Sequence, residues 1–265
     1  MDHTTALRAY DTQLRTEAET AAALAVTRLG PLHLALYEGG RGFVTYQDLG
    51  GADAAEVRRL VAGAVEHFRA DPAVREAEWK TRGHDHAPGL HEALLEHGFV
   101  PDEPESVMIG DVRALAGQEP PLPEGVTLRR VTAEADVRAM CAMQARGFGH
   151  GDADRSAAEL LRRLAAGEDL ELWVAETDGR VVTAGRLEPV AGTEFAGIWG
   201  GVTLPEWRGR GIYRALTAAR ARSAIALGKR FVHSDSTEYS RPILERYGFL
   251  RVTTTTPYEW TRPGK

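Results

Sequence analysis

Hydrophobic positions recur with two different periods along the chain. A spacing of three to four residues predicts amphipathic helices at residues 4–28, 54–69, 88–97, 133–146, 153–166 and 209–227. Short apolar runs between turn-forming residues predict strands, of which the clearest lie at residues 32–37, 41–46, 74–80, 126–131, 170–176, 180–187, 195–204 and 230–235. Strands and helices alternate from one end of the chain to the other, and this order predicts an α/β protein.

Glycine-containing turns join neighbouring strands at two places. Glu38-Gly39-Gly40 and Asp178-Gly179 each separate two apolar runs, and both predict hairpins. Towards its end the chain reads strand, short helix at residues 240–247, and two strands at residues 249–254 and 257–260.

A proline-rich segment divides the chain into two halves. Residues 114–125 read ALAGQEPPLPEG, and their three prolines cannot donate backbone hydrogen bonds. We expect a linker there, between a domain of residues 1–113 and a domain of residues 126–265. The two halves carry a weak internal repeat, because a shift of 150 positions aligns Asp85 with Asp235, Leu94 with Leu244, Gly98 with Gly248 and Phe99 with Phe249. Two unrelated α/β halves or one irregular domain are the alternatives.

Composition narrows the class of protein. The 265 residues are 43% hydrophobic and 26% charged, which is typical of a folded globular chain and not of a disordered one. The formal net charge is −6, so we do not expect a general nucleic-acid binder. Cys141 is the only cysteine, which excludes an internal disulfide. Neither an export signal nor a membrane-spanning run is visible, and we expect a cytoplasmic protein without a membrane partner.

The segment from Gly200 to Arg214 carries most of the candidate chemistry. It reads GGVTLPEWRGRGIYR, which predicts the end of a strand, an arginine- and glycine-rich turn, and the start of a helix. Glycines let the backbone approach an anion closely, and the first N–H groups of a helix have no intrahelical acceptor. Seven basic residues and no acidic one lie between Trp207 and Arg230. We therefore expect a polyanionic ligand here, with an ordinary solvated arginine-rich helix as the alternative.

This turn resembles the acyl-CoA motif of the GCN5-related N-acetyltransferases (GNAT), commonly written Gln/Arg-x-x-Gly-x-Gly/Ala. The matching residues are Arg208-Gly209-Arg210-Gly211-Ile212-Tyr213, with Tyr213 in place of the final small residue. The predicted order of elements over residues 126–261 is also similar to that of the family. The resemblance implies a mixed, mostly antiparallel twisted sheet flanked by helices, and acetyl-CoA as co-substrate without a metal. By analogy with tandem members of the family, the first half resembles a degenerate second copy.

The resemblance also implies the residues that contact acyl-CoA. Strand backbone groups would bind the pantetheine arm, and the turn and the helix start would bind the pyrophosphate. These residues are Gly201, Val202, Thr203, Arg208, Gly209, Arg210, Gly211, Ile212, Tyr213 and Arg214. Ser240 is a further candidate, because it could face the thioester sulfur, and its structural alternative is the N-cap of the helix that follows. The glycine pair at 200–201 fits this role independently, because glycine inside a strand often marks a bulge or the close approach of a ligand.

Catalytic residues are less clearly marked. The family often uses a tyrosine four residues before the glycine of a Gly-Phe pair, and here that position is Leu244. Tyr239 and Asp235 are the candidates to replace it, as general acid and as a group that orients or deprotonates the amine. Each has a structural alternative, because Tyr239 could be packing and Asp235 could close a turn. Proton exchange with solvent could also suffice, with catalysis resting on positioning.

The first half lacks the basic turn. Its corresponding segment reads GGADAAEVRR, and Asp53 and Glu56 near the helix start would repel a pyrophosphate. The histidines at 84, 86, 91 and 97 have no supporting cysteines, and we expect no metal site.

These observations predict an N-acetyltransferase that moves an acetyl or other acyl group from acetyl-CoA to a primary amine in a direct ternary complex. The acceptor would be a small molecule or a peptide, and the sequence leaves the oligomeric state open. A catalytically silent acyl-CoA-binding module is the first alternative. A nucleic-acid-binding protein that uses the basic helix is the second, and the net charge disfavours it.

Overall fold

The computed structural model describes residues 1–118 and 120–263. The chain forms two compact units: the first contains residues 1–108, 235–241 and 251–265, and the second contains residues 109–234 and 242–250. The expected linker at residues 114–125 includes residue 119, which lies outside the described residues, and the expected division into domains 1–113 and 126–265 stays a prediction.

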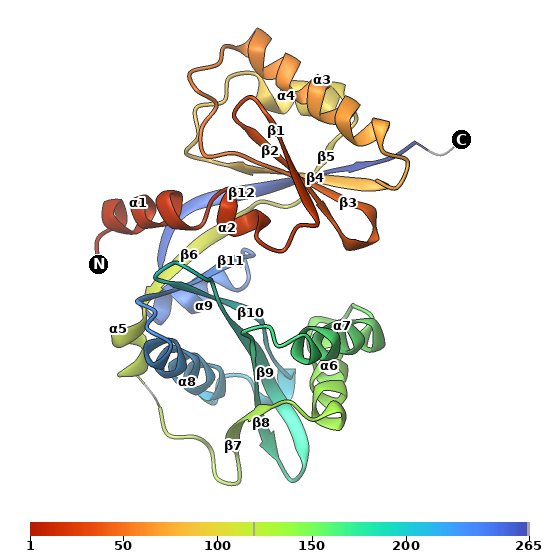
Figure 1. Ribbon diagram of the computed structural model, residues 1–265. Coiled ribbons are helices and arrows are strands. Elements are labelled where there is room, and N and C mark those ends of the chain that lie inside the picture. Colours follow the sequence, from red (N-terminus) through yellow and green to blue (C-terminus); the bar gives the residue numbers. More distant parts are fainter. Residues whose placement is uncertain (119, 264–265) are drawn as a thin grey trace. The chain divides into compact units, whose positions relative to one another are not determined.

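The first unit is an α/β layer with strand order β1-β2-β3-β4-β12. Its helices are α1 (His3–Gln13), α2 (Glu17–Thr20), α3 (Ala54–Ala70) and α4 (Leu90–Glu96). Its strands are β1 (Ala25–Leu29), β2 (Leu32–Tyr37), β3 (Arg41–Thr45), β4 (Glu76–Arg82), β5 (Val100–Pro101), the first part of β6 (Glu105–Asp111) and most of β12 (Leu250–Thr261). Helices α3 and α4 cover one face of the sheet (Figure 1).

An amphipathic face of α3 builds the core of the first unit. Val57, Val61 and Phe68 point inwards at helical spacing and belong to one cluster with Trp79 of β4 and Trp260 of β12. The Trp79 indole is fully buried, although its nitrogen has no hydrogen-bond partner.

Two predictions for the first unit and the chain end are wrong. The predicted helix at residues 4–28 stops at Gln13, and residues 25–29 form a strand that pairs antiparallel with β2. Thr16, at φ 56°, interrupts the helical path. The predicted strand pair at residues 249–254 and 257–260 is one continuous strand, β12, which pairs with β4 from Thr255 to Thr261. The predicted hairpin at residues 38–40 is confirmed.

The second unit has strand order β11-β10-β9-β8-β7. Its strands are β7 (Thr127–Val131), β8 (Glu171–Thr177), β9 (Arg180–Pro189), β10 (Phe195–Thr203) and most of β11 (Phe231–Ser236). Its helices are α5 (Val112–Ala116), α6 (Glu134–Phe148), α7 (Ala153–Ala165), α8 (Ile212–Ala226) and most of α9 (Arg241–Arg246). Every neighbouring pair in this order is antiparallel except β10 and β11.

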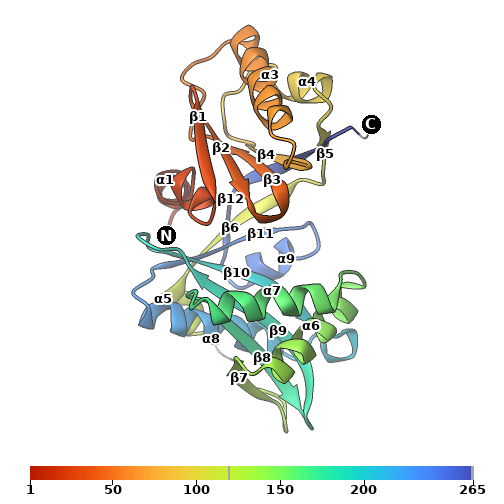
Figure 2. The same ribbon diagram turned by 45° about the vertical axis from the view of Figure 1, so that its right-hand side comes forward.

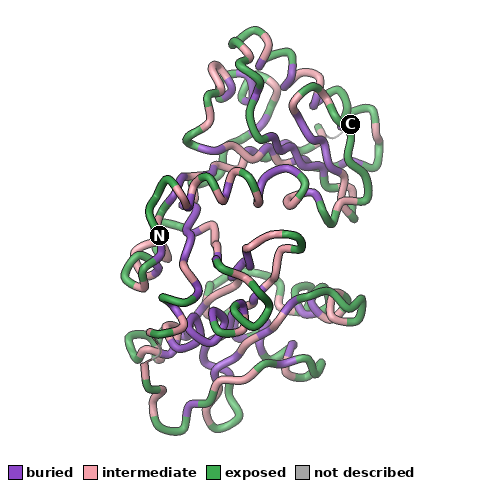
Figure 3. Tube along the Cα trace, turned by 60° about the vertical axis from the view of Figure 1, so that its left-hand side comes forward, coloured by how far each residue is buried: buried purple, intermediate pink, exposed green. Residues whose placement is uncertain are grey.

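Helices cover both faces of this second sheet. The pair α6 and α7 lies on one face, and α8 lies on the other (Figure 2). Buried positions in each unit gather on the strands, whereas many connecting turns are exposed (Figure 3). The β8–β9 hairpin is confirmed, with Asp178 and Gly179 both at positive φ as a two-residue type I′ turn requires.

Candidate functional site

A bulge in β10 interrupts the sheet of the second unit. Strand β10 pairs in parallel with β11 from Phe195 to Gly197, and within the described chain this pairing goes no further. On its other side the register with β9 shifts between Trp199 and Val202. The strand nevertheless continues to Thr203. Backbone groups beyond Gly197 on the β11 side are therefore free of ladder bonds and can pair with an extended ligand.

Two glycines make the bulge possible. Gly200 has φ 62°, and a Cβ atom there would lie 2.7 Å from Nε2 of Gln144. A Cβ atom at Gly201 would lie 2.5 Å from Oη of Tyr213. Gln144 donates from Nε2 to the Gly200 carbonyl at 2.7 Å, which fixes the bulge to α6. No larger side chain fits at either glycine without displacing a neighbour.

The predicted turn follows directly. After a short 3₁₀ helix at Pro205–Trp207, Gly209 and Gly211 adopt φ 75° and 80°, and α8 begins at Ile212. The first helical bond runs from the amide of Ala215 to the carbonyl of Gly211, and no side chain caps the helix. The amides of residues 212–214 therefore have no intrahelical acceptor, and the first turn contains no acidic residue.

Three arginines surround this helix start. Arg208 donates from Nε to the carbonyl of Thr203 at 3.0 Å, so it ties the turn to the strand end. The Arg210 guanidinium lies over the Trp207 ring at 4.7 Å. Arg214 donates to Gln118 at 2.8 Å, and its buried Nε has no partner. Among the residues that the structure describes, none of the three arginines forms an ion pair with a carboxylate.

Tyr213 connects the helix to the bulge. Its ring lies beside that of Tyr247, with centroids 6.2 Å apart, and below the guanidinium of Arg220 at 5.7 Å. The Arg220 side chain is fully buried on α8 and has no carboxylate partner in the described part of the chain. Burial lowers its pKa, and a hydrogen bond to Tyr213 acts in the opposite direction.

The structure thus brings together the predicted residues Gly201 to Thr203 and Arg208 to Arg214 in the second unit. The other three predicted residues, Asp235, Tyr239 and Ser240, lie in the segment that packs with the first unit. The Tyr239 side chain is 81% exposed. The Ser240 hydroxyl lies 3.3 Å from that of Thr237.

Asp235 belongs to a buried ionic cluster of the first unit. Its carboxylate accepts from Nζ of Lys80 at 2.8 Å, and Glu19 lies 3.6 Å from the same nitrogen. Glu19 also pairs with Arg82, whose side chain is fully buried. Burial alone would lower the pKa of Lys80, but the carboxylates of Asp235 and Glu19 outweigh it and raise this pKa. Lys80 is therefore a cation held beside the Asp235 carboxylate.

A small cavity adjoins the bulge in the second unit. It has a volume of about 260 Å³ and is bordered by α6, α7, the loop between them, β9 and Gly200. Gln144 and Arg186 lie on its wall next to Gly200. Neither residue was predicted from the sequence. For Gln144 a signal exists, because it continues the apolar stripe of Val137 and Cys141 and is the polar member of that buried face.

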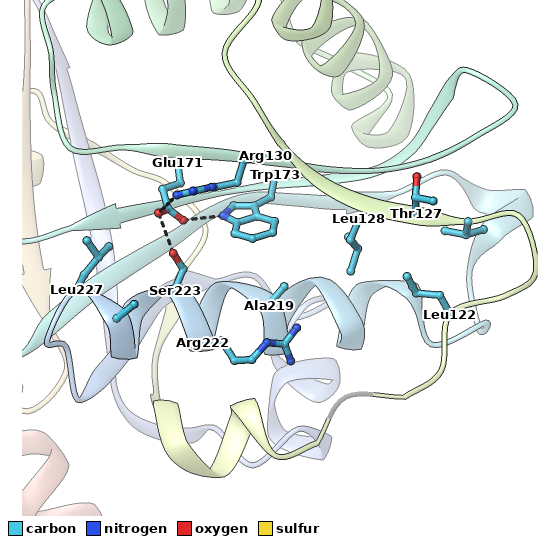
Figure 4. A pocket seen from close by; sticks show the side chains of 12 residues that line it. Leu122, Thr127, Leu128, Arg130, Glu171, Trp173, Ala219, Arg222, Ser223 and Leu227 are labelled. Atoms are coloured by element: carbon cyan, nitrogen blue, oxygen red, sulfur yellow. Dashed lines mark hydrogen bonds and ion pairs between the residues drawn. The ribbon is translucent and has the colours of Figure 1, made fainter.

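A larger cavity of the second unit lies elsewhere. It measures about 770 Å³ and is bordered by β7, β8 and the C-terminal half of α8 (Figure 4). Its carboxylate, Glu171, already accepts hydrogen bonds from Arg130, Trp173 and Ser223. None of the bulge or turn residues borders it. Its greater volume therefore does not connect it with the candidate site.

Metal and membrane features are not found in the described residues. No group of three or more histidine, cysteine, aspartate or glutamate side chains there is placed to hold a metal ion. His84 lies within hydrogen-bonding distance of Thr253 and Asp11, at 2.8 and 3.1 Å. None of the described helices has the length and hydropathy needed to cross a bilayer.

Comparison with known proteins agrees with this geometry. Residues 122–234 match the family model of the acetyltransferase (GNAT) domain. No functionally curated protein matches the sequence. A GCN5-related N-acetyltransferase from Kribbella flavida is 19% identical in sequence, with a TM-score of 0.65 over 99% of this chain and 95% of its own. A tandem GNAT protein from the clavulanic acid biosynthesis pathway is 18% identical, with a TM-score of 0.63 over 88% of this chain and 79% of its own.

The fold and the β10–turn–α8 unit define a protein of the GNAT fold. The match of residues 122–234 to the acetyltransferase (GNAT) domain confirms the resemblance drawn from the Arg208–Tyr213 motif, and the solved structures show the fold. The predicted fold class, a mixed and mostly antiparallel sheet flanked by helices, is also confirmed.

Proposed function

We propose that the protein is an N-acyltransferase that transfers an acetyl or other acyl group from acyl-CoA to a primary amine in a direct ternary complex. The observation that carries this proposal is the start of α8, where three free amides and three arginines without carboxylate partners meet at a glycine turn. Cations at a helix N-terminus oppose the helix dipole, and an anion between them removes that conflict. The pyrophosphate of acyl-CoA is such an anion.

Coenzyme A fits the residues present. The buried Nε of Arg214 lacks an acceptor, and the amides of residues 212–214 lack one within the helix. The unpaired edge of β10 beyond Gly197 offers backbone groups to the amide-containing pantetheine arm. We assign Gly201 to Thr203 to the arm and Arg208 to Arg214 to the pyrophosphate, and we keep Ser240 as a further contact.

The reaction requires a neutral amine nucleophile. Its nitrogen attacks the thioester carbonyl, a C–N bond forms, the C–S bond breaks, and the proton lost by nitrogen passes to the thiolate or to solvent. We keep Tyr239 as the candidate proton donor, because its hydroxyl is accessible. We keep Asp235 as the candidate that orients the amine. Its ion pair with Lys80 favours an electrostatic role over proton abstraction.

One observation favours the alternative of a silent acyl-CoA-binding module. Leu244, at the position where the family often has a tyrosine, is buried and cannot donate a proton. A module of this kind would bind acetyl-CoA without consuming it in the presence of any amine.

Calorimetric titration with acetyl-CoA tests the binding half of the proposal. We expect one site per chain, and Arg210→Glu should weaken binding at least about tenfold, because a charge-assisted contact of about 1.5–3 kcal/mol becomes repulsive. Arg222→Glu is the matched control, since it makes the same charge change at an exposed position in the C-terminal half of α8, away from the glycine turn. Wild-type protein that does not bind would contradict both functions.

Thiol release from acetyl-CoA in the presence of a panel of amines separates the enzyme from the silent module. We expect turnover with at least one amine, reduced by Tyr239→Phe or Asp235→Asn. Lys80→Met is informative beside Asp235→Asn, because it removes the lysine partner of the carboxylate and keeps the carboxylate itself. Binding without turnover on every amine would favour the silent module.

A further inference from the structure

The 260 Å³ cavity beside the bulge has a polar wall that suggests what it binds. Its volume lies just below the range of roughly 300–1,000 Å³ found for drug-sized ligands, so it suits a small metabolite. Gly200 is part of its border, and the unpaired edge of β10 begins nearby. An acceptor bound here would therefore lie next to the strand that we assign to acyl-CoA.

Arg186 presents an available guanidinium to this cavity. Its Nε donates to Glu188 at 2.9 Å, whereas Nη1 and Nη2 have no acceptor within the part of the chain that the structure describes. Nη1 lies 3.3 Å from the point where a Cβ atom of Gly200 would be. The side chain is 27% exposed, so a ligand can reach it. Two parallel N–H groups of this kind match a carboxylate.

A salt-bridge network holds Arg186 in place. Glu188 accepts from Arg186 and also from Nη2 of Arg163 at 2.9 Å. Burial by itself would raise the pKa of Glu188, but its bonds to Arg163 and Arg186 outweigh this and lower it. Glu188 therefore stays ionised and orients the guanidinium before a ligand arrives. Such preorganisation reduces the entropic cost of binding.

Two carboxylates also border the cavity. Asp152 and Glu159 are both exposed, whereas the second arginine of the lining, Arg163, is paired with Glu188. A second carboxylate on the acceptor would be repelled by Asp152 and Glu159, whereas a neutral or basic group would not. The cavity thus offers Arg186 to one anionic group and has two carboxylates that disfavour another.

We propose that the acceptor amine is an α-amino acid with a neutral or basic side chain, and that Arg186 binds its carboxylate. The inference rests on the proposed acyltransferase function and names the substrate class of that site. In an α-amino acid the amine is one carbon away from the carboxylate, so binding at Arg186 places the nitrogen beside Gly200. The nearby guanidinium also lowers the pKa of the amine, which increases the fraction of neutral nucleophile.

Matched pairs of amino acids and their amides test this inference. Thiol release from acetyl-CoA is measured with L-lysine and L-lysinamide, and with L-alanine and L-alaninamide. We expect kcat/KM to be at least about tenfold higher for each acid than for its amide, mainly through KM, because a bidentate charged contact is lost in the amide. A preference for the acid is informative because the amine of the amide has the lower pKa. Without a contact to the carboxylate, the amide would therefore react faster near pH 7.

Variants assign the preference to Arg186. Arg186→Met should bring the ratio of acid to amide to one or below, because the amine of the amide has the lower pKa, and Arg186→Lys should keep part of the preference for the acid. Arg162→Met is the control, because Arg162 is exposed on α7 next to Arg163 and does not border the cavity. Thermal melting of each variant verifies folding, since Glu188 keeps its bonds to Arg163 in Arg186→Met.

Binding measurements separate failure of the inference from failure of the proposed function. The amino acid and the amide are also titrated calorimetrically into protein saturated with coenzyme A. If acetyl-CoA does not bind, the proposed function fails and the inference with it. If acetyl-CoA binds but acid and amide bind or react equally well, or neither amino acid binds nor reacts, then only the inference is overturned. L-aspartate should bind more weakly than L-alanine.

Discussion

Replacing Gly201 by alanine tests the geometry of the bulge directly. A Cβ atom at this position would lie 2.5 Å from Oη, 2.8 Å from Cε2 and 3.0 Å from Cζ of Tyr213. Gly201 is not among the glycines with positive φ, so alanine can adopt its backbone conformation. The perturbation is therefore steric, and it acts on a single neighbouring ring.

The expected magnitude follows from how firmly that ring is held. Tyr213 lies beside Tyr247 and under the buried Arg220, so moving it disturbs a packed cluster. Overpacking of this kind costs about 1–3 kcal/mol. Alanine recovers about 0.4–1 kcal/mol by restricting the unfolded chain. The net loss in the free energy of unfolding should be about 1–2 kcal/mol.

Urea denaturation of a double-mutant cycle is the assay. Gly201→Ala, Tyr213→Ala and the double variant are compared with the wild type, and the clash disappears when the ring is removed. We expect a coupling energy of at least about 1 kcal/mol, with Gly201→Ala nearly harmless in the Tyr213→Ala background. Gly209→Ala is the control: nothing lies within 4 Å of its Cβ position, and its effect should come from its φ of 75° alone. Effects that add within about 0.5 kcal/mol would refute this account of the bulge.

Three further predictions concern single contacts. Gln144→Leu removes the donor to the Gly200 carbonyl, and urea denaturation should show a loss of about 1–3 kcal/mol, whereas no loss would mean that water replaces the amide. Glu19→Gln leaves buried Arg82 without its ion pair and should cost about 3–5 kcal/mol near pH 7. Burial raises the pKa of Glu19, but Arg82 lowers it further, so the net shift is downwards. The stabilisation is therefore present above the unfolded pKa and is lost as pH falls through the folded pKa. Melting curves of the wild type and Glu19→Gln should converge in acid and not in base. Arg214→Met should weaken acetyl-CoA binding about tenfold in calorimetry while the melting temperature changes little, because the folded protein loses one hydrogen bond, to Gln118, and is relieved of the unsatisfied Nε.

Local chemistry explains which elements the sequence predicts correctly. The turn before α8 depends on glycines at positive φ and on the start of a helix. Residues adjacent in the sequence determine both features, so the sequence predicts them. The helix predicted at residues 4–28 fails because residues 25–29 gain a strand partner in β2, and helical spacing carries no information about that distant pairing. The same reason applies to β12, whose continuity depends on its pairing with β4.

Only one part of the candidate site could be predicted from the sequence. Its anion-binding part lies in one segment and could be predicted from residues 200–214. Its acceptor side depends on Gln144 and Arg186, which are separated in sequence and meet at Gly200 only after α6 packs on β9 and β10. An arginine in a strand has no spacing pattern that distinguishes a surface ion pair from a wall of a cavity. Its role follows from Glu188, which occupies Nε and leaves the other two nitrogens available.

Arg220 connects the two parts of the site. A fully buried guanidinium without a carboxylate costs stability, and burial accordingly lowers its pKa. Its contacts account for its place: Nη1 donates to the carbonyl of Arg186 at 3.2 Å, and the guanidinium lies over the ring of Tyr213, which lies against Gly201. One buried cation therefore fixes the backbone of the proposed acceptor-binding arginine and the ring that shapes the bulge. Replacing Arg220 by methionine would remove an unfavourable buried charge, but it would also remove the contacts that hold Arg186 and Tyr213. The contribution of Arg220 therefore lies in the alignment of these two residues and not in an ion pair.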